Sequence, residues 1–340
     1  MVHKLATIAL IGLGASAVCI GAAGAIDKKD FSDGWDGFSL FDGRPHCEAV
    51  AGATAANREM DWDGSSRAAL NLLGQASYTP GSGDKLQASG DPQLLAHLRI
   101  RKGTVELDCR GWRDRTKDLA ITLPGREFEK FEVTGGRLTI AKLQQQRVSI
   151  EIAGSGKVQA SGKLQDSIKL GIAGSGEMQL GEIAAPSGKM EIAGSGTMRA
   201  QSVAIDDLKL EIAGSGRAEV GQLAAHTNRL DIAGSGTVIA RGTSDDLNVE
   251  IGGSGRADFG NVASRTARVE IGGHGDVDIA PTEKAKIEIG GSGDVTLHSN
   301  PTELDTEIGG SGRIHRLAGG LEEPRMAEGK TAGYPLLLPQ

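Results

Sequence analysis

The stretch Lys189-Met-Glu-Ile-Ala-Gly-Ser-Gly-Thr-Met198 decides the fold, because nine copies of its central motif occur along the chain. The glycine before the serine (a histidine in one copy) stands at positions 154, 174, 194, 214, 234, 253, 273, 291 and 310, so neighbouring copies are 18–20 residues apart. Two residues earlier every copy has isoleucine: Ile152, Ile172, Ile192, Ile212, Ile232, Ile251, Ile271, Ile289 and Ile308. A repeat of this length is typical of a solenoid in which each copy forms one coil.

Within each copy, apolar and polar residues alternate. The position four residues before the glycine is apolar in eight of nine copies, and the position three before it is acidic in eight of nine. Alternation with period two indicates strands with one buried face. A helix is excluded because Gly and Ser interrupt every repeat. The sequence therefore predicts an all-β fold, a single-stranded parallel β-helix of about 20-residue coils, with Gly-Ser-Gly at a tight turn.

The first 25 residues have the pattern of a secretory signal peptide. An apolar run from Leu5 to Cys19 follows Lys4 and precedes the small residues Ala23-Gly-Ala25, which predicts cleavage after Ala25 and export of the protein. A membrane anchor is one alternative, and Cys19 raises lipidation as another, although the residues before it form a poor lipobox. No later stretch approaches the ~20 apolar residues of a membrane span, so we expect none in the mature chain.

The remaining boundaries follow from composition. Residues 26–57 are polar and predict a flexible linker, whose aromatic segment 31–43 could instead be a docking peptide. Residues 58–134 contain less regular strand-like runs and predict opening coils that cap the β-helix. The regular repeats occupy 135–317, and the tail 318–340 is expected to cover part of the other end. We expect roughly 12–13 coils in all.

Two cysteines remain after cleavage, Cys47 and Cys109. Thiols in an oxidising compartment normally pair, so we predict a disulfide that ties the N-terminal segment to the folded body. A reactive thiol is the alternative. His46, which precedes Cys47, is the one neighbouring histidine that could lower the pKa of such a thiol.

The net charge and the composition argue against several classes of binding partner and cofactor. The formal net charge of -7 argues against nucleic acid, which requires a basic stripe. Histidine and cysteine do not cluster with zinc-ligand spacing, and we expect no cofactor. The acidic column could hold divalent cations, but the column two residues earlier is basic in six of nine copies: Lys169, Lys189, Lys209, Arg229, Arg268 and Lys286. A charge-balanced, solvated face is therefore the favoured interpretation.

Two function classes remain. β-Helix enzymes that cleave acidic polysaccharides need long loops that form a cleft and clustered acid–base groups, and the constant 18–20 spacing leaves no room for such loops. Serine follows the motif glycine in every copy but one, from Ser155 onward, and His274 replaces it once. Catalytic serines need a neighbouring His or Asp, and no column of such residues accompanies this serine row, so we interpret the serines as residues of the turn. We predict a non-catalytic exported scaffold that binds a cell-surface, matrix or envelope polymer, with a lyase or hydrolase of anionic glycans as the alternative.

The repeats resemble an exported bacterial family, the auto-transporter adhesin head GIN domain. The resemblance rests on Leu119-Ala-Ile-Thr-Leu-Pro124, Phe131-Glu-Val-Thr-Gly-Gly136 and the repeated Ile-x-Gly-Ser-Gly-x-Val motif. The opening segment, from Trp62-Asp-Gly64 through Asp84-Lys-Leu-Gln-Ala-Ser-Gly-Asp91, is also similar, so the resemblance covers roughly residues 58–317. It implies a right-handed parallel β-helix in an envelope or surface setting and transfers no active-site residue.

Overall fold

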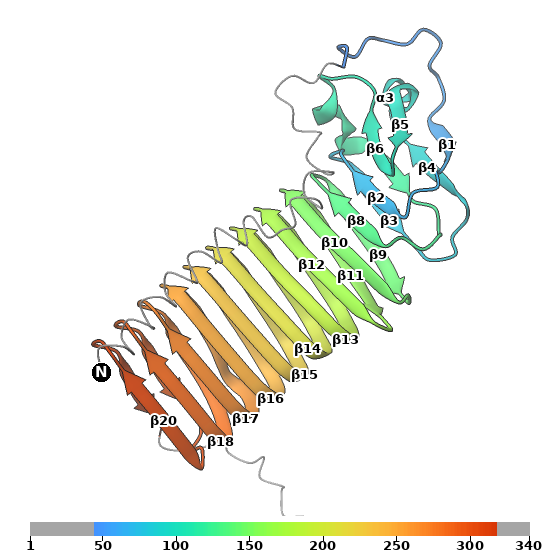
Figure 1. Ribbon diagram of the computed structural model, residues 1–340. Coiled ribbons are helices and arrows are strands. Elements are labelled where there is room, and N and C mark those ends of the chain that lie inside the picture. The colour runs from blue at the N-terminus through green and yellow to red at the C-terminus, as the bar shows by residue number, and fades with distance from the viewer. Residues whose placement is uncertain (1–43, 318–340) are drawn as a thin grey trace, which may run out of the picture.

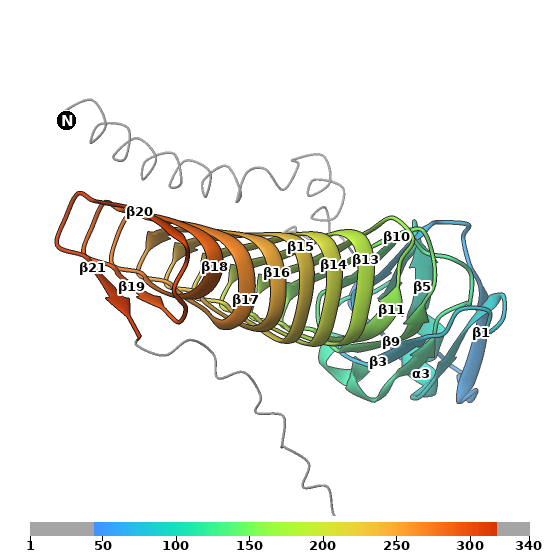
Figure 2. The ribbon, with the colours of Figure 1, turned by 90° about the horizontal axis from the view of Figure 1, so that it is seen from below.

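A computed structural model describes residues 44–317 (Figure 1). The predicted signal peptide with its cleavage site Ala25, the aromatic segment 31–43 and the tail 318–340 lie outside the described residues. The described chain is almost all β and forms a parallel solenoid, which confirms the predicted fold class. Figures 1 and 2 show an elongated rod, with the residues that precede the regular coils gathered at one end.

The regular coils stack in parallel and in register. From β13 to β18, one strand element runs around most of each coil, and Ile192 pairs with Ile212, which pairs with Ile232. Eight of the nine motif isoleucines are at most 2% exposed and form a continuous internal column. The strands of this part are β8 (Lys130–Val133), β9 (Arg137–Leu143), β10 (Arg147–Gly154), β11 (Lys157–Lys163), β12 (Ser167–Gly174), β13 (Glu177–Gly194), β14 (Thr197–Gly214), β15 (Arg217–Gly234), β16 (Thr237–Gly253), β17 (Arg256–Ile271), β18 (Asp276–Ile289), β19 (Asp294–Leu297), β20 (Glu303–Ile308) and β21 (Arg313–Arg316).

The motif glycines allow successive coils to approach closely. Gly194 has a φ of 122°, in the region that favours glycine, and a Cβ there would lie 2.6 Å from the carbonyl oxygen of Gly174. At Gly196, a Cβ would lie 2.5 Å from the Cγ2 atom of Ile172. The amide of Ser195 donates to the carbonyl of Gly174 over 3.0 Å, so the turn continues the ladder between coils. Both glycines are therefore required by contact with the coil below.

The N-terminal cap has a chain order that differs from its spatial order. Its elements are β1 (Asn57–Asp61), β2 (Arg67–Leu70), β3 (Gln75–Tyr78), β4 (Lys85–Ser89), helix α3 (Pro92–His97), β5 (Leu98–Arg101), β6 (Thr104–Leu107), a 3-10 helix (Arg113–Asp118) and β7 (Ala120–Thr122). The rung made by β2 and β3 pairs in parallel with β6 and β7 on one side, and with β8 and β9 on the other. Along the rod, the strands β6 and β7 are therefore outermost, β2 and β3 come next, and β8 and β9 follow. In the sequence, however, β2 and β3 come before β6 and β7.

The prediction of 12–13 coils is wrong, because the solenoid has about 9 turns. The strand-like runs of residues 58–134 do form strands, but β1 pairs antiparallel with β4, β4 with β7, and β5 with β6. β1, β4 and β5 join the cap through these antiparallel pairs and therefore add no further coils. The buried rings of Tyr78, Phe128 and Phe131 pack against one another at its centre, with centroids 4.9–5.6 Å apart.

Residues 44–57 are attached to this cap. Cys47 and Cys109 form a disulfide with Cα atoms 4.9 Å apart, and the amide of Cys47 donates to the carbonyl of Arg110 over 2.9 Å. Arg44 also pairs with Glu106 over 2.9 Å. The described end of the segment expected to be a flexible linker is therefore fixed by covalent and polar contacts.

At the opposite end, the last coil leaves its edge open within the described residues. Ile308 is 44% exposed and Leu317 is 46% exposed, whereas the earlier members of the isoleucine column are buried. None of the helices in residues 44–317 has the length and hydropathy required to cross a membrane.

Candidate functional site

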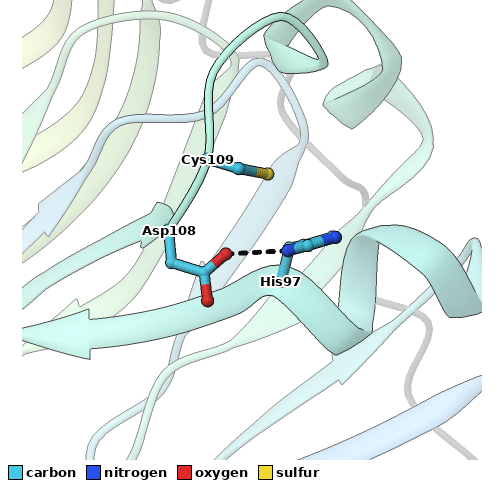
Figure 3. A group of neighbouring side chains, drawn as sticks. All are labelled: His97, Asp108 and Cys109. Carbon is cyan, nitrogen blue, oxygen red and sulfur yellow. Dashed lines mark hydrogen bonds and ion pairs between the residues drawn. The ribbon is translucent and has the colours of Figure 1, made fainter. Parts of the chain in front are cut away.

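His97, Asp108 and Cys109 form the one group in residues 44–317 whose metal-ligand atoms lie within 4.8 Å of one another (Figure 3). The antiparallel β5–β6 pairing brings His97 and Asp108 together, and His97 Nδ1 lies 2.8 Å from Asp108 Oδ1. His97 Nε2 contacts the carbonyl of Glu48 at 2.9 Å, and Arg99 pairs with the other Asp108 oxygen at 2.7 Å. Because Cys109 is in the disulfide, it offers no thiolate to a metal. The group holds the cap together.

The acidic and basic columns form alternating ion pairs along one face of the rod. Lys189 contacts both Glu191 and Glu211, and Lys209 contacts Glu211 and Asp231. Burial alone would raise the pKa of Glu211, but hydrogen bonds from Lys209 and Lys189 outweigh it and hold this pKa at about 2. These carboxylates are thus neutralised by protein ammonium groups, which favours a charge-balanced face over a cation-binding one.

The ion-pair pattern is interrupted at Asn248, which replaces a basic residue beside Glu250. Burial raises the pKa of Glu250, and repulsion from Asp231 and Glu270 raises it further. Burial also raises the pKa of Asp231, which Lys209 opposes. No three carboxylates of this column converge within ligand distance among the described residues, so the stretch is a site of repulsion with no ligand cage.

This contrast predicts opposite effects for two similar substitutions. Glu250→Gln is expected to stabilise the protein by about 0.2–1 kcal/mol at pH 7, because it removes like-charge repulsion between adjacent strands. A raised pKa means that this repulsion develops as the pH rises above the ordinary value of 4.5, so the gain disappears below it. Glu211→Gln is expected to destabilise by about 1 kcal/mol at pH 7, an effect lost as the pH falls from 4.5 towards 2. Urea unfolding across this pH range measures both, and equal responses would contradict the assigned electrostatics.

The serine row lies at the exposed corners, as its turn chemistry requires. Ser195 and its equivalents face solvent, and His274, the one replacement, contacts the hydroxyl of Ser292 in the next coil. Among residues 44–317, no carboxylate bonds to the other ring nitrogen of His274. The pair lacks the third group that orients a catalytic histidine.

A polar groove with a volume of about 480 Å³ crosses the outer face of the cap sheet. Its floor is five neighbouring strands in the order β1–β4–β7–β3–β9. Strand register places two rows of outward side chains across it: Glu59, Gln87, Thr122, Ser77 and Thr139 in the first, and Asn57, Ser89, Ala120, Gln75 and Arg137 in the second. Most of these side chains are amides or hydroxyls, and no aromatic ring lines the groove.

The groove is held in shape by contacts behind it. The guanidinium of Arg58 donates to the carbonyl of Leu98 over 3.0 Å and also contacts that of Leu95, which fixes β1 to the end of α3. The hydroxyls of Ser77 and Thr122 lie 3.4 Å apart across the floor. The sequence did not single out these residues, because they come together only through the non-local order of the cap strands. One available signal was the uncharged polar residues at outward positions, where later coils carry Arg199 or Glu219.

Several solved structures are similar to about three quarters of this chain. A solved structure described as "Putative lipid binding protein from Parabacteroides distasonis" is 20% identical, with a TM-score of 0.42, over 77% of this chain and 96% of that one. A "putative adhesin from Parabacteroides merdae" is 14% identical over 77% and 95% of the two chains, with a TM-score of 0.42. A "putative adhesin from Parabacteroides distasonis" is 13% identical over 77% and 96%, with a TM-score of 0.47. A comparison with curated proteins finds no match.

The family model described as "Putative auto-transporter adhesin, head GIN domain" matches residues 69–222 and 188–301. These ranges include most of the cap and nearly all the regular coils, the same part of the chain that carries the repeated motif. The chain belongs to this family.

Proposed function

We propose that the protein is a non-catalytic, exported binding protein that acts as an adhesin on a cell-surface, matrix or envelope polymer. The observation that carries the proposal is the polar groove on the cap of a rod with a continuous apolar core. A stiff rod can hold such a surface away from its point of attachment, and flexible loops are not needed to shape it. The family description and the signal-peptide pattern of residues 1–25 support the same assignment.

The enzymatic alternative, a lyase or hydrolase of anionic glycans, receives less support from the groove. Glycoside hydrolysis uses a pair of carboxylates on either side of the scissile bond. Glu59 is the one carboxylate among the described residues that line the groove. Arg58, which lies next to it, is already bonded to backbone carbonyls. The described groove can therefore bind a polymer but does not offer paired acid–base groups.

Binding and turnover are separated by one experiment on the mature chain, residues 26–340. The purified protein is passed over immobilised neutral and acidic polysaccharides, and each soluble polymer is incubated with it and followed at 235 nm and by chain length. We expect retention on at least one polymer with no change in its chain length. Unsaturated product that disappears on a single Asp or Arg substitution would establish the enzyme instead, and the absence of retention on every polymer would refute a binding role.

A further inference from the structure

We infer that the cap groove binds an extended, neutral glycan chain that lies across β1, β4, β7, β3 and β9. This inference rests on the proposed binding function and assigns it a ligand class and a surface. The five strands span about 19 Å from first to last at their usual spacing. The lining residues come from all five strands, so a ligand that contacts the whole groove must be extended.

The lining matches the chemistry of sugar hydroxyls. Amide and hydroxyl side chains both donate and accept hydrogen bonds, as do the hydroxyls of a sugar ring. The side chains of Gln75, Gln87 and Thr139 point outward and have no hydrogen-bond partner elsewhere in residues 44–317. Their polar groups are therefore available to a ligand without breaking existing bonds.

Other ligand classes fit the lining less well. A nucleic acid requires several cationic contacts. Of the two described cations that line the groove, Arg58 is bonded to backbone carbonyls, and Arg137 alone has a side chain with no hydrogen bond or ion pair within residues 44–317. A lipid chain requires apolar surface, and an added peptide strand requires an open sheet edge, whereas this groove lies on a polar sheet face. Its two outer strands carry opposite charges, Glu59 on β1 and Arg137 on β9. Glu59 repels acidic sugars at one end, so the full length of the groove favours a neutral chain.

The test blocks the groove and compares it with a matched position. Ser77 lies at the centre of the floor, and Ser77→Trp would fill it. Thr197 faces outward on β14, in the continuation of the Gln75–Arg137 row outside the groove, so Thr197→Trp is the control. The mature chain and both variants are titrated with the neutral hexasaccharides cellohexaose, maltohexaose and chitohexaose, and with an acidic hexagalacturonate, by NMR. Circular dichroism confirms that each variant is folded.

We expect at least one neutral hexasaccharide to bind, weakly because no aromatic ring contributes, and to bind more tightly than hexagalacturonate. Ser77→Trp should abolish saturation and Thr197→Trp should leave it unchanged. Gln75→Ala and Gln87→Ala should each weaken binding by about 2- to 12-fold, the loss of one hydrogen bond. If no neutral hexasaccharide binds, or if both tryptophan variants bind equally, the inference is overturned. The proposed binding function falls separately, only if the polymer panel also retains nothing.

Discussion

Replacing Gly194 by alanine is expected to reduce the free energy of unfolding by roughly 2–6 kcal/mol, the sum of backbone strain and overpacking. Two features of the site act together. The φ of 122° is disfavoured for any residue with a Cβ, and that atom would lie 2.6 Å from the carbonyl oxygen of Gly174. Because the contact is with backbone, relief requires the two coils to separate and their ladder to lengthen.

Gly171→Ala is the matched control for this substitution. Gly171 lies in β12 with no positive φ, and a Cβ there would meet only the Cγ atom of Glu151 at 3.4 Å. We expect it to be neutral or slightly stabilising, since alanine also restricts the unfolded chain. Urea unfolding of the two variants beside the wild type is sufficient. Equal stability of both variants would contradict the stacked glycine corner.

Removing the disulfide with Cys47→Ala and Cys109→Ala is expected to cost up to about 4 kcal/mol, from the loop entropy of residues 62 apart in sequence. The loss should be confined to the cap, because the regular coils are stabilised by contacts with their neighbours. Amide hydrogen exchange should therefore become faster in residues 44–61 and 98–118 and remain slow in β13–β17.

The wild type reduced with dithiothreitol provides the control, because it should reproduce the exchange pattern of the double variant. Two titratable thiols in the untreated protein of residues 26–340 would show that the bond does not form. An unchanged cap in the double variant would show instead that the polar contacts of Arg44 and His97 hold the segment without it.

The regular coils were predictable because every repeat contains the same motif and the same alternation of apolar and polar residues. Ile192 and Gly194 each have equivalents about twenty residues away, so period and alternation determine which face is buried and where the chain turns. The ladder of Lys189 and Glu191 follows from the same alternation, and its interruption at Asn248 is visible in the sequence. Because successive coils stack in parallel and in register, equivalent residues of the repeats lie next to one another in columns along the rod.

For the cap, the sequence predicted that strands occur but not the order in which they lie in the sheet. No repeat indicates that β7 lies between β4 and β3, or that the β2–β3 rung is enclosed by later segments. The groove depends on that order. Ser77 on β3 and Gln87 on β4 lie on either side of Thr122, because the later strand β7 lies between these two consecutive strands. His97 meets Asp108 across the local β5–β6 hairpin, a contact that the sequence analysis did not identify.

Hydrogen exchange of residues 26–340 with and without a saturating neutral hexasaccharide tests most directly the claim that the cap groove is the binding surface. We predict that slower exchange on binding is confined to the groove strands β1, β3, β4, β7 and β9, and that the coils from β13 onward are unchanged. Protection centred on β13–β17, or no protection at any strand, would contradict it.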